Sequence, residues 1–138
     1  MVKTETVSIE TRGNGHMVNV TDRVAEFVKN AGLDEGVVIV FTPGATAAVT
    51  TIEFESGLEQ DFARLMEELA PRQREYAHNA RWGDGNGHSH VRASLLGPSL
   101  AVPVLDGRPI LGTWQQIIVL DFDAHPRSRK VVFQAIGE

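Results

Sequence analysis

Histidine is the residue in this sequence whose spacing most strongly suggests chemistry. Of the five histidines, His78, His88 and His90 fall within thirteen residues of a polar, glycine-rich stretch. Imidazole is the commonest metal ligand and the usual acid or base near neutral pH, so this clustering points to a metal-binding or acid–base site. The simpler alternative is a solvated polar loop with no chemical role.

Whether His88 and His90 can bind the same ion depends on the backbone conformation. In an extended segment both side chains point to one face about 7 Å apart, close enough to share one ion. On a helix they would lie about 200° apart. The glycines at positions 83, 85 and 87 favour the extended alternative.

Carboxylates and guanidinium groups elsewhere in the chain could complete such a site. Zinc and hard divalent ions both accept carboxylate oxygens, and the candidate carboxylates are Glu53, Glu55 and Asp61. Arginine binds phosphate in a bidentate manner, and the candidate arginines are Arg72, Arg74, Arg81, Arg92 and Arg108. Taken singly, each of these side chains is more typical of a solvated surface.

The elements that must position these residues indicate an α+β domain. Apolar residues at helical spacing predict helices over 21–31, with Thr21 as N-cap and Gly32 as the end, and over 58–69, ended by Pro71. Residues 91–96 suggest a further short helix, and residues 72–88 show no periodicity. Strands are predicted over 4–9, over 37–41 and 47–54 as adjacent central strands, and over 99–104, 110–122 and 130–136.

Length and composition limit the possible functions. A chain of 138 residues with 42% hydrophobic and 22% charged residues predicts one soluble domain over 1–138. The net charge of -5 argues against binding to nucleic acid or an anionic membrane surface, and no apolar run is long enough for a membrane helix. The absence of cysteine excludes disulfides and thiolate metal sites and fits a cytoplasmic protein.

Five motifs occur in an order and spacing that cover nearly the whole chain. They are Tyr76-Ala77-His78, then the run from Asn86-Gly87-His88-Ser89-His90 to Gly97-Pro98-Ser99, then Val102-Pro103-Val104, Leu111-Gly112-Thr113-Trp114-Gln115, and Arg129 with Gly137-Glu138. In these motifs the sequence strongly resembles the YjbQ-like family, also called UPF0047. The resemblance implies a compact α+β domain with a folded-over, mostly antiparallel sheet and two or three helices, assembled as a homotrimer.

The resemblance also implies activity as a secondary thiamine-phosphate synthase. That enzyme joins a pyrimidine diphosphate to a thiazole phosphate and releases pyrophosphate. A divalent metal ion, zinc or magnesium, would neutralise the leaving group. The small phosphorylated metabolite is therefore the expected binding partner.

Residue roles follow position by position. The recurrent histidines of the family match His78 and His90, which we expect to be catalytic. The expected metal ligands are His78, His88, His90 and Glu53, and Asp61 matches a further acidic position. We expect Arg92 and Arg108 to bind phosphate.

One position departs from the family pattern. The family usually has His-Thr-Thr/Ser-Ala before the second central strand, whereas this chain has Gly44-Ala45-Thr46-Ala47. Loss of the leading histidine puts catalysis in question. Two alternatives therefore stay open: a noncatalytic oligomeric protein that binds a metal or anion, and a metal-dependent phosphohydrolase that uses water as the nucleophile.

Overall fold

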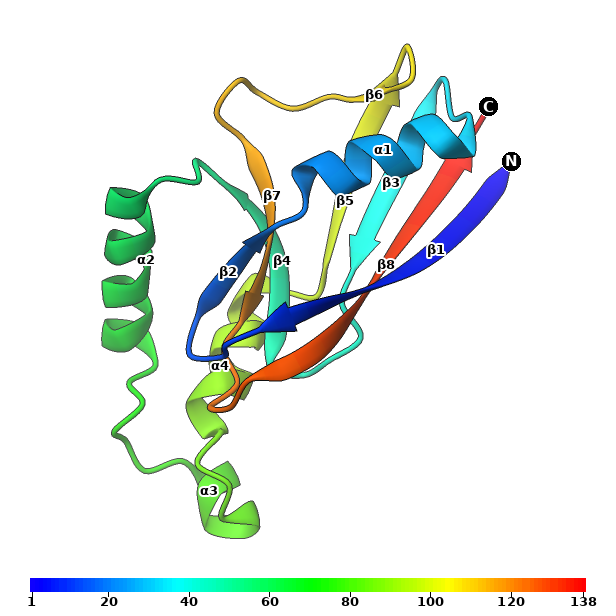
Figure 1. Cartoon of the computed structure of the whole chain (residues 1–138). Helices are drawn as coiled ribbons and strands as arrows, with labels where there is room; N and C mark the ends of the chain where they lie inside the picture. The colour runs from blue at the N-terminus through cyan, green and yellow to red at the C-terminus, as the bar shows by residue number, and fades with distance from the viewer.

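Two antiparallel sheets and four helices make up the computed structural model, which describes residues 1–138 (Figure 1). The five-stranded sheet has the order β1 (Val2–Thr11), β8 (Arg127–Gly137), β3 (Gly36–Phe41), β5 (Ser99–Leu105) and β6 (Arg108–Pro109). The three-stranded sheet has the order β2 (His16–Asn19), β7 (Gln116–Asp121) and β4 (Ala47–Ile52). The helices are α1 (Thr21–Ala31), α2 (Ser56–Leu69), α3 (Ala77–Trp82) and α4 (Gly87–Leu96). The α+β class predicted from the sequence is confirmed.

The larger hydrophobic core lies between the two sheets and α1. It takes Val38 and Val40 from β3, Val24 and Phe27 from α1, and alternate residues of β7 such as Val119. The other residues of β7 face a smaller core under α4, to which α2 contributes Met66. Because β7 is buried on both faces, it reads in the sequence as a continuous apolar run rather than an alternating one.

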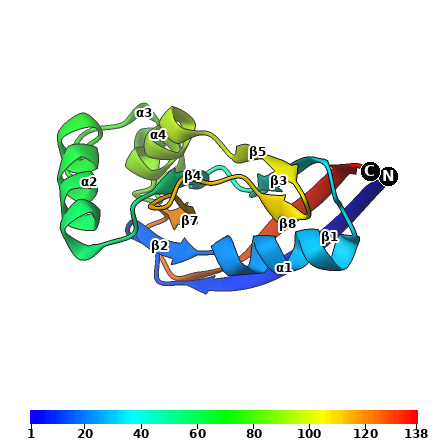
Figure 2. The same ribbon diagram turned by 90° about the horizontal axis from the view of Figure 1, so that it is seen from above.

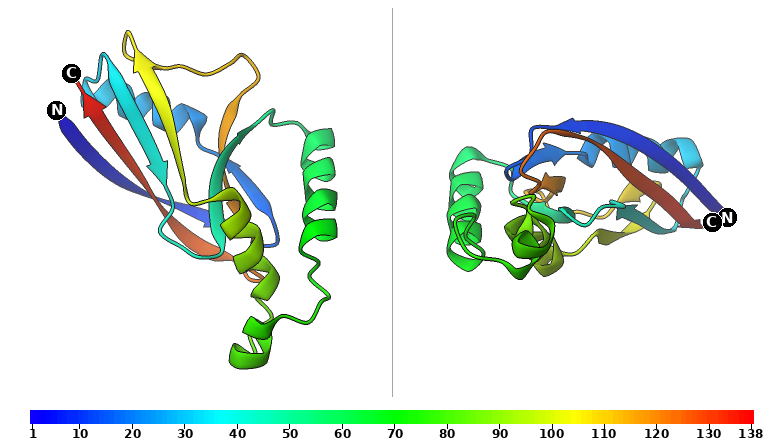
Figure 3. Two further views of the ribbon diagram at one scale, coloured as in Figure 1. Left: turned by 180° about the vertical axis from the view of Figure 1, so that it is seen from behind. Right: turned by 90° about the horizontal axis from the view of Figure 1, so that it is seen from below.

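The outer face of the five-stranded sheet carries no helix, as Figure 3 shows from behind. Register places Val37 between Ile136 and Pro103, Ile39 between Gln134 and Ala101, and Phe41 between Val132 and Ser99. All these side chains are exposed or half-buried. We call the apolar members the open apolar face; they are Val37, Ile39, Phe41, Ala101, Pro103, Val132 and Ile136.

Both predicted amphipathic helices are confirmed. α1 ends at Gly32, whose left-handed φ of 70° suits glycine, and α2 ends before Pro71. The N-cap assignment of Thr21 is wrong, because Thr21 is the first helical residue and Val20 precedes it as cap. The Thr21 hydroxyl instead accepts a hydrogen bond from the Ile117 N–H and so ties α1 to β7.

Three expectations about the strands and loops are wrong. Residues 37–41 and 47–54 are not adjacent strands, because β3 pairs with β5 and β8 whereas β4 pairs with β7. Strand 110–122 is shortened to β7, since the chain after Pro109 makes a turn in which the Gly112 N–H donates to the side chain of Gln115. Residues 72–88 contain α3 and the start of α4, which brings the helices to four. None of them is long and apolar enough to cross a membrane.

Candidate functional site

Helix α4 carries His88 and His90, but on opposite sides. The extended segment expected here is wrong, because residues 87–96 are helical and the Asn86 carbonyl accepts the N–H groups of Ser89 and His90. Gly87 serves close packing, since a Cβ there would lie 2.5 Å from the Cβ of Tyr76. As a result His88 points into the interior, where it is 1% exposed, and His90 is only half-buried.

His78 and His90 lie in contact with one another. Their ring centroids lie 4.3 Å apart, which brings α3 and α4 together through these two imidazoles. His78 Nδ1 lies 3.4 Å from Asp84 Oδ1 and makes no hydrogen bond. We call His78 and His90 the imidazole pair. It places two groups able to donate or accept a proton in contact, with a carboxylate next to one of them.

A groove of about 530 Å³ adjoins the imidazole pair. Its wall includes Asn79, the residue after His78, and Asp84, the carboxylate that faces His78. Arg72, Arg74 and His125 line it together with a second carboxylate, Glu75, so the two guanidinium charges are balanced by the carboxylates of Glu75 and Asp84. We call this hollow the basic groove. Guanidinium groups on a concave surface of this size suit a small phosphorylated ligand.

The four expected metal ligands do not come together within one chain. No three His, Asp or Glu side chains are placed to hold a metal ion. His88 faces the interior, away from His90, and Glu53 is exposed between β4 and α2. Asp61 pairs instead with Arg64 at 2.7 Å on the surface of α2. The residues of a single chain therefore do not fit the three or four protein ligands that zinc requires.

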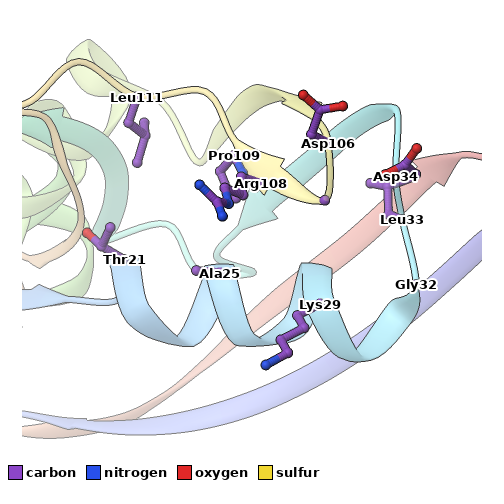
Figure 4. A pocket seen from close by; sticks show the side chains of 11 residues that line it. Thr21, Ala25, Lys29, Gly32, Leu33, Asp34, Asp106, Arg108, Pro109 and Leu111 are labelled. Carbon is purple, nitrogen blue, oxygen red and sulfur yellow. The ribbon is translucent and has the colours of Figure 1, made fainter.

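The two arginines expected to bind phosphate lie in different surroundings. Arg92 is buried, and it donates from Nε to the Ala70 carbonyl at 3.0 Å and from Nη2 to Glu67 at 2.8 Å. It thus joins α4 to the end of α2. Arg108 points into a separate hollow of about 780 Å³ between α1 and β6 (Figure 4). Neither lines the basic groove.

A buried charged cluster at the ends of β7 and β8 was not predicted from the sequence. Arg129 makes a bidentate pair with Asp121, with Nε and Nη2 each 2.8 Å from a carboxylate oxygen. Nη2 also donates to the Thr46 hydroxyl, which in turn donates to Asp123 at 3.0 Å. The one available signal was the pair of acids that follows the apolar run of β7.

Hydrogen bonds keep the two buried carboxylates ionised. Burial alone would raise the pKa of Asp121, but hydrogen bonds from Arg129 and Thr11 outweigh it, so the pKa lies below its ordinary value. The pKa of Asp123 is lowered in the same way against burial, by hydrogen bonds from the His125 N–H, Asn86 and Thr46. Asn86 also accepts from the Ala124 N–H at 2.9 Å, which ties the cluster to the start of α4.

His88 should make stability depend on pH. Burial first, and then the nearby charges of Arg92 and Arg72, hold its pKa below the ordinary 6.5. Below pH 6.5 the unfolded chain therefore binds a proton at His88 more readily than the native state does. As the pH is lowered, the free energy of unfolding decreases by at most about 1.4 kcal/mol per pH unit. Urea unfolding between about pH 7 and 5.5 measures this slope, which should be smaller in His88→Gln.

The matched control for this test is His16→Gln. The pKa of His16 is also lowered, by burial and by Arg12, so His16 makes its own contribution to the pH dependence. His16→Gln should remove that contribution and leave the contribution of His88 in place. An unchanged slope in His88→Gln would contradict the assignment of a neutral, buried His88.

Known proteins resemble this chain over almost its entire length. A family model described as UPF0047 protein YjbQ-like matches residues 5–138. A UPF0047 protein of Archaeoglobus fulgidus is 38% identical over 94% of this chain and 98% of its own, and the UPF0047 protein YugU of Bacillus subtilis is 32% identical over 96% and 98%. Among solved structures, hypothetical protein APE1520 of Aeropyrum pernix K1 has a TM-score of 0.91 at 33% identity and covers 99% of both chains. SSO2532 of Sulfolobus solfataricus P2, described as a YbjQ-like protein of unknown function, has a TM-score of 0.90 at 29% identity over all of both chains.

Proposed function

The chain belongs to the YjbQ-like family, UPF0047, and from that premise we propose that it acts on a small phosphorylated metabolite, with thiamine-phosphate synthesis as its reaction. The observation that carries the proposal is the imidazole pair next to the basic groove. In this reaction the thiazole nitrogen forms a bond to the pyrimidine's methylene carbon as the bond from that carbon to the diphosphate breaks, so negative charge develops on the oxygen that joined the carbon to phosphorus. Cations and a proton donor at that oxygen are what the reaction needs.

Each part of the site has a role in this proposal. Arg72 and Arg74 bind the phosphate groups, because two guanidinium groups can each donate two parallel hydrogen bonds to phosphate oxygens. One imidazole of the pair supplies the proton to the leaving pyrophosphate, and the second imidazole holds the first in position. No step is routed through a zinc ion, because one chain does not gather the three protein ligands that zinc requires. Zinc or magnesium binding stays a prediction from the family resemblance.

The test is a turnover assay with the pyrimidine diphosphate and the thiazole phosphate. We expect His78→Ala and His90→Ala each to lower kcat/KM by about 100-fold or more, because a positioned acid or base contributes that much. His16→Ala is the matched control and should act like the wild type, since His16 lies on β2 and lines neither the pair nor the groove. Equal turnover in all three variants would refute the role of the imidazole pair.

Binding without turnover is the second candidate, favoured by Gly44 in place of the family's histidine and by the lack of three convergent ligands. Calorimetry with pyrophosphate separates the two candidates. Affinity that Arg74→Ala abolishes, with no product formed by the wild type, supports binding alone. Release of inorganic phosphate from a phosphorylated substrate would instead support the phosphohydrolase alternative.

We also propose that the active form is a homotrimer in the cytoplasm. The open apolar face supports self-association, since the face of an antiparallel sheet that is exposed to water normally carries polar side chains. The lack of cysteine in the sequence fits a reducing compartment.

A further inference from the structure

Arg129 presents one guanidinium nitrogen that the protein leaves without a partner. The side chain is locked, since Nε and Nη2 both bond to Asp121 and the residue is only 9% exposed. Nη1 makes no hydrogen bond within the protein, and the only fully buried side-chain nitrogen or oxygen atoms without a partner are those of His78 and His88. Nη1 is therefore reached by solvent, at the end of an otherwise buried and rigid side chain.

Gly44 is what keeps this nitrogen open. A Cβ at residue 44 would lie 2.8 Å from Arg129 Nη1, closer than real Cβ contacts allow. The φ of Gly44 is not in the left-handed region, so the backbone does not require glycine there. Glycine at this position therefore leaves open space instead of permitting an unusual backbone conformation, and that space lies directly against Nη1.

Two backbone donors follow in the same loop. The N–H groups of Ala45 and Thr46 donate to no acceptor in the protein, although the Thr46 side chain is bonded to both Arg129 and Asp123. The loop that carries these N–H groups contacts the guanidinium through the Thr46 hydroxyl, and unpaired backbone N–H groups beside a guanidinium can bind an anion. Arg129 needs no ordering before it binds, which reduces the entropic cost of association.

We propose that Gly44, Ala45, Thr46 and Arg129 form a binding site for the phosphoryl group of a small anion. Three donors on different groups suit the several oxygens of a phosphoryl group better than the two of a carboxylate. The charges of Asp121 and Asp123 offset those of Arg129 and Arg127, so direct hydrogen bonds rather than net charge provide the affinity. The proposal is independent of the proposed function, whose groups are the imidazole pair and the basic groove.

The experiment is an NMR titration of the wild-type protein with inorganic phosphate, followed on the backbone amides of Ala45 and Thr46. We expect saturable shifts of both amides with phosphate and much smaller shifts with acetate at equal ionic strength. Gly44→Ala should weaken phosphate binding by about tenfold or more, because it displaces or covers a charge-assisted donor.

Two variants serve as controls. Gly112→Ala, whose Cβ would meet only the flexible Gln115 side chain, and His78→Ala should both keep the wild-type affinity at these amides. The proposal is overturned if phosphate gives no saturable shift at Ala45 and Thr46 in the wild type, or if acetate binds there equally well. Loss of the shifts in His78→Ala would also overturn it, since the site would then belong to the imidazole pair.

Discussion

Replacing Arg129 with methionine is expected to lower the free energy of unfolding by about 3–5 kcal/mol near neutral pH. Asp121 is fully buried, and in the variant it loses both hydrogen bonds of the bidentate pair while its charge stays in the interior. Methionine fills a similar length, so the loss reflects the unpaired carboxylate more than a cavity. Urea unfolding of the wild type and the variant measures the difference.

The pH dependence identifies the cause of that loss. In the wild type the pKa of Asp121 lies below its ordinary 3.8, so the pair stabilises the protein above that pH and the contribution is lost as pH falls through the native value. In the variant burial acts without the hydrogen bonds and charge of Arg129, so the pKa of Asp121 is higher than in the wild type and protonation costs the native state less. The deficit should therefore shrink as the pH is lowered towards about 4.

Arg127→Met is the matched control for this prediction. Arg127 pairs with Asp123 at 2.9 Å, but its side chain is half exposed, so its removal should cost at most about 1 kcal/mol. A loss of similar size in both variants, or a deficit in Arg129→Met that does not change with pH, would contradict the argument.

The local elements could be predicted from the sequence, but their partners could not. Apolar spacing specifies α1 and α2, and the β-branched run from Val37 specifies β3. Neither pattern shows that β4, the strand after Gly44, belongs to the three-stranded sheet instead of the sheet that contains β3. That choice depends on β7, which lies far along the chain and pairs with β4 on one side and β2 on the other.

The candidate site was predicted in composition and missed in geometry. His78 and His90 come together, as their selection from the sequence required, but through the packing of α3 on α4 rather than through an extended strand. The glycine before His88 indicated a loop, whereas its function is to admit Tyr76. Arg129 could not be joined to Asp121 beforehand, because their contact depends on the positions of two strands in different sheets.

Replacing Ile39 with glutamate is expected to convert an assembled protein into a monomer. Ile39 lies in the middle of the open apolar face, on the central strand β3, with Ala101 and Gln134 as its cross-strand neighbours. A charge there would have to be buried in any interface made by this face, at a cost of several kcal/mol per ion. The monomer itself should keep its stability, because the core side chains of β3 are Val38 and Val40 on the opposite face.

Sedimentation equilibrium at micromolar concentration is the measurement. The wild type should show a mass about three times the 15.1 kDa of the chain, as the proposed trimer requires, and Ile39→Glu should show the mass of a single chain. Asn30→Glu, on the exposed side of α1, adds the same charge away from this face and should keep the wild-type mass. A wild type that sediments as a single chain would refute the assembly, and an Ile39→Glu variant with the wild-type mass would place the interface elsewhere.

Because the imidazole pair and the basic groove lie around α3 and α4, away from β3, the monomeric variant also shows whether that site binds pyrophosphate without a second copy of the chain.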